Sequence, residues 1–493
     1  MRKAVFLFFL IALLTGCGKE VDPPDPVTPP QLVGSDPADG AEGVAGETLT
    51  LTLTFDQNIK CSSQQQKKVT VDGGAVIDNV SAYNTDLKIS LSGLEDGSGK
   101  AYRVDVPEGT VSGFKTGQED AAGISISFTM KYVEPYVPSV LDPVKTLTNP
   151  KASKEAQNVY GFLLEQSGKK TLSGVQSSHS HKNDFVDAVY KHTGKHPALA
   201  GYDFLFLQFS PTPDNWSWVQ NYNDISAPKE QWAAGGLVNY MWHWNVPDSK
   251  SAWDNGVNNY NFDGYAFYCD QTSFDIREAL KPGTWQNDFI MKDIEEVAGY
   301  LQLLEDENIP VIWRPLHEAA GNYNLYGPNG AWFWWGRGGA EPCKQLWRLL
   351  YDQLVNVYGL DNLIWVWTVD VTKGAEDQYI DWYPGDEYVD ILGVDIYETN
   401  TDAKTRQYQA MVDMTKGKKL VTVSECGNIP DPAKNMEAGN RWSWFMVWCN
   451  SDSNGNIVMT PSDNNFKLNT SEYWKTVMSS PYVINREDMP NLK

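Results

Sequence analysis

The feature that most constrains this chain is a series of apolar, β-branched segments with helix-like stretches such as Asp288–Glu307 and Pro342–Tyr358 between them. Buried parallel strands have this appearance because helices cover both of their faces. Eight of them with crossovers predict an α/β fold of the (β/α)8 barrel type, and a doubly wound sheet is the less favoured alternative. The candidate strands are Thr171–Gln176, Ala198–Phe206, Leu237–Trp244, Val311–Glu318, Leu363–Asp370, Val389–Tyr397, Leu420–Gly427 and Trp442–Asn450.

Two of these strands change from apolar to polar where they end. The fourth reads Val-Ile-Trp-Arg-Pro-Leu-His-Glu and ends at Glu318, and the seventh carries Glu425 after Leu-Val-Thr-Val-Ser. The C-terminal ends of barrel strands form the mouth in which active sites are built. Glycoside hydrolysis needs two carboxylates there, one to protonate the leaving oxygen and one to attack or assist at the anomeric carbon. Either Glu alone could be a solvated strand end, but the two together predict a catalytic pair.

Residues 31–133, which precede the barrel, show short strands in which polar and apolar residues alternate. Thr48–Phe55 alternates polar and apolar residues over eight positions, and roughly seven such strands predict a small all-β sandwich. The segment resembles bacterial Ig-like domains in Asp36-Pro-Ala-Asp-Gly40, Leu53-Thr-Phe-Asp56 and Thr110-Val-Ser-Gly113. Because it contains no Trp, we expect a spacer and not a sugar-binding module.

The first 30 residues predict a processing signal and a tether. Arg2 and Lys3 precede an apolar run that is too short to span a bilayer. This signal, residues 1–16, runs into Leu14-Thr15-Gly16-Cys17, which resembles a bacterial lipobox and predicts lipidation of Cys17. Residues 17–30 contain five prolines and predict an extended tether, and residues 134–145 predict a second linker before the barrel at 146–493. We expect a lipid anchor in the outer membrane, at the cell surface or on the periplasmic face.

Charge and aromatic content restrict the partner. A net charge of -23 disfavours nucleic acid and anionic membrane surfaces, which would be repelled. An uncharged ligand is compatible with it. The 19 Trp and 24 Tyr residues include candidates for stacking on sugar rings, although we expect most of them in the core.

Neither a metal nor a cofactor is expected. Apart from Cys17 the chain has an odd number of cysteines without Cys-x-x-Cys spacing, which favours free thiols: Cys61, Cys269, Cys343, Cys426 and Cys449. His179-Ser-His181 has metal-like spacing, but no cysteine or carboxylate cluster nearby in the sequence completes a ligand set.

The barrel segment resembles glycoside hydrolase family 26, whose best-known members are endo-β-1,4-mannanases. The matching motifs, in chain order, are Gly201-Tyr-Asp203, Trp242-His-Trp244, Trp313-Arg-Pro-Leu-His-Glu318, Trp332-Phe-Trp-Trp-Gly336, Gly393-Val-Asp-Ile-Tyr397 and Ser424-Glu425. The resemblance implies a retaining double displacement, with Glu318 as the acid/base and Glu425 as the nucleophile. Retention requires carboxyl groups about 5–5.5 Å apart.

The resemblance also implies substrate contacts. It implies that Tyr397 contacts the nucleophile and that His243 and His317 line the site next to the scissile bond. It places Trp332 in the leaving-group subsite and Trp448 beneath the reacting sugar. Arg314 could hold the charge of the nucleophile or form a structural ion pair. Trp334 and Trp335 are expected to be packing residues.

One loop departs from the family pattern. The 13 residues between Glu318 and Trp332 are more than the compact loop of the motif, which leaves the number of product-side subsites open. Tyr323 and Tyr326 lie on this loop and could contact a glycan, although a plain surface loop is favoured.

These features predict a monomeric endo-glycosidase that hydrolyses internal β-1,4-mannosidic bonds of mannan, galactomannan or glucomannan. A β-1,3-1,4-glucanase or a β-1,3-xylanase of the same family is the alternative. A non-catalytic surface glycan-binding lipoprotein is a third possibility, which the presence of both Glu318 and Glu425 disfavours.

Overall fold

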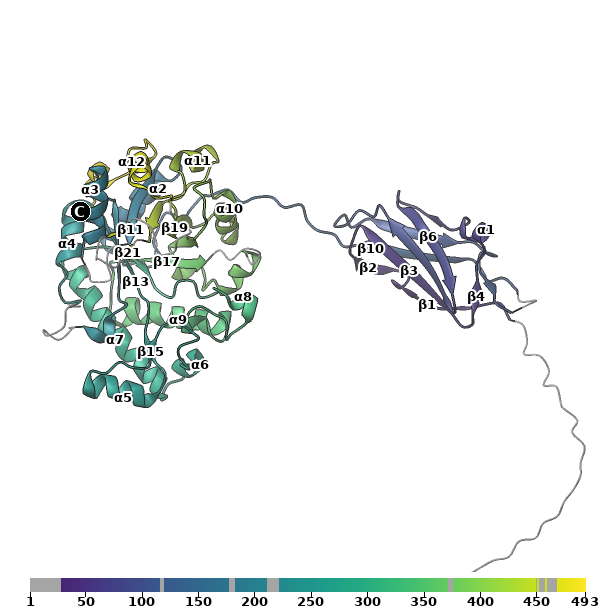
Figure 1. Cartoon of the computed structure of the whole chain (residues 1–493), viewed down its shortest axis with the longest axis horizontal. Coiled ribbons are helices and arrows are strands. Elements are labelled where there is room, and N and C mark those ends of the chain that lie inside the picture. The colour runs from purple at the N-terminus through teal and green to yellow at the C-terminus, as the bar shows by residue number, and fades with distance from the viewer. Residues whose placement is uncertain are drawn as a thin grey trace, which may run out of the picture. The chain divides into compact units, whose positions relative to one another are not determined.

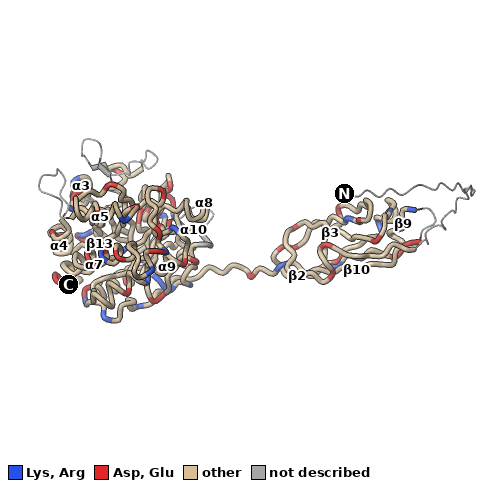
Figure 2. Tube along the Cα trace, turned by 90° about the horizontal axis from the view of Figure 1, so that it is seen from below, with Lys and Arg blue, Asp and Glu red and all other residues tan. Residues whose placement is uncertain are grey.

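The computed structural model describes residues 28–115, 119–176, 182–210, 221–370, 376–448, 450–451, 457–458 and 468–493. The chain divides into two compact units between Val137 and Pro138 (Figure 1). Acidic and basic residues are interspersed along both units (Figure 2). Among the helices of the described residues, none is both long and apolar enough to cross a bilayer.

The first unit is the predicted β-sandwich. One sheet has the order β1-β3-β7-β6 and the other β2-β10-β8-β5. Alternation along β3 buries Leu51, Leu53 and Phe55, which share one core with apolar residues of β7, β8 and β10. The elements are β1 Leu32–Asp36, β2 Ala41–Val44, β3 Thr48–Phe55, β4 Ile59–Lys60, α1 Ser63–Gln66, β5 Thr70–Val71, β6 Val76–Tyr83, β7 Asp86–Ser92, β8 Ala101–Val106, β9 Ser112–Gly113 and β10 Ile124–Met130.

The second unit is the predicted barrel. Eight parallel strands follow the order β12-β13-β16-β17-β18-β19-β20-β11, and pairing of β11 with β12 closes the ring. A further short strand, β23 (Val483–Ile484), pairs with the start of β11. The eight strands are β11 Thr171–Gln176, β12 Leu199–Asp203, β13 Leu237–Met241, β16 Val311–Arg314, β17 Leu363–Asp370, β18 Ile391–Ile396, β19 Leu420–Cys426 and β20 Trp444–Val447.

Helices surround the ring (Figure 1), and α2, α3, α7, α9 and α12 bury apolar residues of one face in the barrel core. α7 carries the predicted 288–307 helix, and α9 continues into a π-helical turn at Asp352–Val357. The helices are α2 Lys154–Gln166, α3 Asp184–Thr193, α4 Ser226–Ala233, α5 Lys250–Asn259, α6 Ile276–Ala279, α7 Trp285–Asp306, α8 Tyr323–Tyr326, α9 Ala340–Tyr351, α10 Thr405–Met414, α11 Pro432–Glu437 and α12 Ser471–Met478. A short antiparallel strand pair, β14 Val246–Pro247 and β15 Tyr265–Ala266, follows β13 and has α5 between its two strands.

Six of the eight predicted barrel strands are shorter in the structure, and only β11 and β17 keep the predicted bounds. β16 ends at Arg314 and not at Glu318, because Pro315 lacks an N–H for the ladder and Leu316 and Glu318 have positive φ values of 49° and 53°. β20 covers Trp444–Val447 instead of 442–450. In the predicted linker 134–145, the segment from Ser139 onward is bonded to the barrel unit, since the Asp142 and Val144 amides donate to the Gly417 and Lys418 carbonyls.

Candidate active site

Strand register brings a row of polar side chains to one end of the barrel. Asp203, the last residue of β12, pairs with Met241, and Met241 pairs with Arg314 at the end of β16. On the other side, Asp370 pairs with Asp395, and Asp395 pairs with Glu425. Because parallel strands end at the same edge, these residues line the C-terminal mouth of the barrel.

A β-bulge in β19 sets the direction of Glu425. The register with β18 shifts between Val394 and Asp395, so that Asp395 pairs with Glu425 and Ser424 has no partner in the ladder. Regular alternation would send Ser424 and Glu425 to opposite faces. Instead, the Ser424 hydroxyl donates to Asp395 Oδ1 at 2.7 Å while Glu425 also reaches Arg314. The bulge therefore aims two consecutive side chains at the mouth.

Arg314 connects the carboxylates. Its side chain is buried, with 1% of the residue exposed, and it donates to Asp395 Oδ2 at 3.1 Å and to Glu425 Oε1. The Tyr397 hydroxyl donates to Glu425 Oε2 at 2.7 Å, while 38% of the residue is exposed. Both oxygens of Glu425 thus accept hydrogen bonds, an arrangement that favours the ionised carboxylate.

The surroundings of Glu318 favour its protonated form, in contrast to those of Glu425. It follows the turn after β16, and its amide donates to the Thr368 carbonyl at 3.2 Å. Burial raises its pKa well above the ordinary value, and the charges of Asp395, Asp370 and Glu425 add to this effect. Burial and Glu425 raise the pKa of Asp395 to about 7, whereas Arg314 and the Ser424 hydroxyl oppose the rise. The proton of this carboxyl cluster is therefore best placed on Glu318.

The distances within the cluster are short. One carboxylate oxygen from each of Glu318, Asp395 and Glu425 lies within 4.8 Å of the others. Such a trio could in principle bind a cation, but the guanidinium of Arg314 already forms ion pairs with both Asp395 and Glu425.

Two histidines stand beside the carboxylates. His243, just after β13, has its Nδ1 2.6 Å from Asp203 Oδ2, and its Nε2 lies 3.2 Å from Nε2 of His317. His317 is buried, and burial together with the Arg314 charge lowers its pKa well below the ordinary value. His243 is partly exposed and its ring meets Trp448 edge to face at 5.8 Å. Trp448 is partly exposed and its backbone amide donates to the Cys426 carbonyl.

The Trp332–Gly336 segment divides into one exposed and two buried tryptophans. Trp332 is 36% exposed and its indole lies over Gly321, where an added Cβ would be 1.7 Å from Cδ1. Trp334 and Trp335 are fully buried, which confirms that they are packing residues. The Trp335 indole donates to the His317 carbonyl at 2.8 Å and so supports the turn that carries the acid.

The enlarged loop forms a short helix of its own, α8. Tyr323 packs edge to face on Trp382 at 5.0 Å, and its hydroxyl lies close to Gly339. Tyr326 points outward with 71% of the residue exposed. Of the two loop tyrosines, Tyr323 is thus a support of the loop and Tyr326 is on its surface.

The structure links Arg314 and Tyr397 to Glu425 and groups His243 with His317 and Trp448, while Trp332 packs over Gly321 on the loop after Glu318. Sequence reasoning assigned no role to Asp203, Asp370 or Asp395, although Asp203 and Asp370 end apolar strands and Asp395 is next to last in one, as Glu425 is in β19. It also missed Tyr268, which stacks on Phe333 at 5.8 Å and whose pKa is raised by burial and by Glu318. Cys17, Cys449 and His179-Ser-His181 lie outside the described residues. Of the other cysteines, Cys61, Cys269, Cys343 and Cys426 are free thiols.

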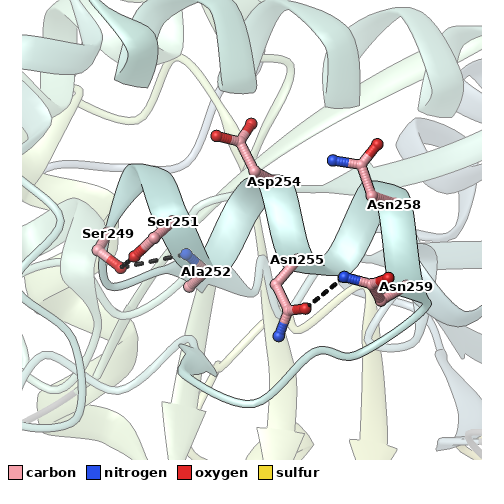
Figure 3. Close-up of a pocket in the computed structure, with 7 residues that line it drawn as sticks. All are labelled: Ser249, Ser251, Ala252, Asp254, Asn255, Asn258 and Asn259. Atoms are coloured by element: carbon pink, nitrogen blue, oxygen red, sulfur yellow. Dashed lines mark hydrogen bonds between the residues drawn. The ribbon is translucent and has the colours of Figure 1, made fainter.

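A second concave surface lies along α5 (Figure 3). It is lined by Ser249, Ser251, Ala252, Asp254, Asn255, Asn258 and Asn259. The side-chain amide of Asn259 donates to Asn255 Oδ1 at 2.8 Å, so part of the polar lining of this surface is already hydrogen-bonded within α5. Its lining residues offer neither a catalytic carboxylate pair nor an aromatic platform, and the mouth of the barrel is the better candidate site.

Comparison with known proteins finds related domains for both units of the chain. The family model described as glycosyl hydrolase family 26 matches residues 148–488, and that of a bacterial Ig-like domain matches residues 26–130. A mannan endo-1,4-β-mannosidase of Thermothelomyces thermophilus is 35% identical over 70% of this chain and 63% of its own length. Mannan endo-1,4-β-mannosidase B of a Piromyces species is 31% identical over 90% of this chain and 71% of its own length.

A solved structure is similar over the same region. The β-mannanase from a symbiotic protist of the termite Reticulitermes speratus, crystallised with a gluco-manno-oligosaccharide, has 32% sequence identity and a TM-score of 0.58. The alignment covers 71% of this chain and 99% of that one. With Glu318 and Glu425 at the barrel mouth and a family match over most of its length, the chain belongs to glycosyl hydrolase family 26.

Proposed function

We propose that this protein is a retaining endo-β-1,4-mannanase that cleaves internal bonds of mannan, galactomannan or glucomannan. The observation that carries the reaction type is the short separation of Glu318 and Glu425, whose nearest carboxylate oxygens lie within 4.8 Å. Inverting enzymes need carboxyl groups about 6.5–9.5 Å apart to hold a water, whereas a covalent intermediate needs them about 5–5.5 Å apart.

In the first step, Glu425 attacks the anomeric carbon while the bond to the leaving oxygen breaks. Glu318, whose raised pKa favours the protonated form, transfers its proton to that oxygen. Arg314 and Tyr397 hold Glu425 ionised and oriented before attack. Formation of the ester removes the charge of Glu425, which favours the ionised form of Glu318. Glu318 then takes a proton from the water that releases the sugar.

The substrate class rests on the walls of the mouth and on the related proteins. Trp332 and Trp448 are both partly exposed, and flat aromatic faces of this kind can stack on sugar rings. The relatives above carry the name mannan endo-1,4-β-mannosidase. Uncharged mannan also suits a protein with a net charge of -23.

The test is to incubate the protein with galactomannan, barley β-glucan and β-1,3-xylan and to follow reducing ends and viscosity. We expect turnover of galactomannan with an early fall in viscosity, a first product of β configuration by NMR, and loss of turnover in Glu425→Ala. Activity on glucan alone would refute the substrate, and an initial α product would refute retention. Binding of galactomannan without turnover would show a glycan-binding protein.

We also propose that Cys17 carries a lipid that holds the protein in the outer membrane. This proposal is supported by the lipobox-like Leu14-Thr15-Gly16-Cys17 and the Pro-rich segment after it. The full-length protein expressed in a Gram-negative host should incorporate radiolabelled palmitate and appear in the outer-membrane fraction. A Cys17→Ala protein that remains in that fraction would contradict the anchor.

A further inference from the structure

Three side chains from successive strand ends form a hydrogen-bonded row beside the acid. Asp203 ends β12, His243 follows β13 and His317 follows β16. Asp203 Oδ1 accepts the backbone N–H of His243 at 3.0 Å, and Oδ2 lies 2.6 Å from Nδ1 of the same residue. His243 Nε2 lies 3.2 Å from His317 Nε2. Asp203 and His317 are buried, whereas His243 reaches the mouth with one edge.

The partners of the two rings fix where their hydrogens lie. A carboxylate only accepts, so Nδ1 of His243 carries a hydrogen. Between the two Nε2 atoms, one must donate. His317 Nδ1 is buried and has no hydrogen-bond partner among the described residues. If a neutral His317 accepted at Nε2, its Nδ1 would be a buried N–H without a partner, which is rarer and more costly than an unfilled acceptor. His317 therefore donates from Nε2 to His243, and its lowered pKa agrees with a neutral ring.

The row ends on the turn that presents Glu318. His317 stands between Leu316 and Glu318, both with positive φ. Its carbonyl accepts the Trp335 indole N–H at 2.8 Å, and its ring is held by His243. The turn is thus fixed once through its backbone and once through a side chain.

We propose that Asp203 is a positioning residue for the acid: it selects the tautomer of His243 that accepts from His317, and so holds the turn that carries Glu318. The catalytic part of this inference rests on the proposed function of Glu318. The tautomers themselves do not depend on which glycan, if any, is cleaved.

Asp203→Asn provides the sharpest perturbation, because an amide has one oxygen where the carboxylate has two. The backbone N–H of His243 can only donate and retains the oxygen, so the amide N–H faces Nδ1. His243 must then carry its hydrogen on Nε2, where it meets the N–H of His317. We expect kcat on galactomannan to fall at least about tenfold. The exposed Asp263→Asn serves as the matched control and should leave kcat unchanged.

The direct readout is long-range 1H–15N correlation NMR of the full chain labelled at histidine. Six histidines give a spectrum in which His243→Gln and His317→Gln identify the two signals. At about pH 7 we expect the Nδ1–H pattern for His243 and the Nε2–H pattern for His317, with His243 switching in Asp203→Asn. A doubly protonated His243 in the wild type, or an unchanged pattern in the variant, would overturn the assignment.

A double-mutant cycle tests the coupling. In Asp203→Asn, a Gln at 317 can accept the relocated hydrogen of His243, so His317→Gln should reduce kcat less there than in the wild type. Independent effects that multiply would show that Asp203 does not act through His317. If the wild type turns over no glycan, the proposed function fails while the NMR pattern still reports on the row.

Discussion

Removing the buried charge of Arg314 should destabilise the barrel in a pH-dependent way. Arg314 is 1% exposed and donates to both Asp395 and Glu425. Arg314→Met keeps the apolar stem but leaves these buried carboxylates without their guanidinium. Loss of one partner of a buried ion pair costs about 3–5 kcal/mol. For a barrel unit of about 350 residues the entropy of unfolding is about 0.7 kcal/mol/K, which predicts a fall in Tm of about 4–7 °C.

The sign of the pH dependence follows from the pKa of Asp395, which is raised to about 7 even with Arg314 present. Without the arginine it rises further, so the folded variant binds a proton that the unfolded chain releases near pH 4. A carboxyl whose folded pKa is raised loses its contribution to stability as pH rises. The difference in stability between variant and wild type should therefore be smaller at pH 5, where Asp395 is protonated in both proteins, and should increase as pH rises above about 7.

Calorimetry of the barrel transition at pH 5 and pH 8 measures this difference. Arg314→Lys is the matched control, because it keeps the charge but not the two-armed donor, and should show a smaller and flatter loss. A penalty that is equal at both pH values, or larger at pH 5, would refute the electrostatic role of Arg314.

Three further predictions concern catalysis. In Asp395→Asn, loss of the neighbouring charge lowers the pKa of Glu318, so the alkaline limb of the kcat/KM profile should move to lower pH; an unmoved limb would exclude this coupling. Tyr397→Phe removes a charge-assisted hydrogen bond of about 1.5–3 kcal/mol to the nucleophile and should reduce kcat/KM about 10- to 150-fold, measured on galactomannan. Gly321→Ala displaces the indole of Trp332 and should lower kcat/KM on oligosaccharides about tenfold, a loss of about 1.4 kcal/mol of transition-state stabilisation. An activated aryl mannoside has no sugar in the leaving-group subsite, so its hydrolysis should be unchanged in Gly321→Ala. An equal loss on both substrates would refute a role of Trp332 in that subsite.

The barrel and its two glutamates could be predicted from the sequence because both depend on residue type and periodicity. Apolar runs give the strands, and a carboxylate at the end of such a run stands out against the core. The same criterion, applied to every strand, would also have singled out Asp203 and Asp395. Their roles depend on which neighbours they meet across the ladder, and strand register is not visible in any one segment.

The fine structure of the mouth depends on backbone irregularities that the sequence pattern does not display. The positive φ of Glu318 belongs to a residue type that seldom adopts it, so it arises from the packed surroundings and not from local preference. Pro315, however, does indicate in the sequence that β16 ends early, because proline lacks the backbone N–H that a central strand donates to its neighbour.

The bulge at Ser424 and Glu425 has a consequence for anyone who would transplant this site to another barrel. A regular strand offers its lumen one side chain in every two, whereas here adjacent positions both serve the mouth. Copying the residues onto an unbroken ladder would turn one of them toward the helices. The graft must therefore include the extra residue of the bulge, because the bulge is what directs both Ser424 and Glu425 toward the mouth.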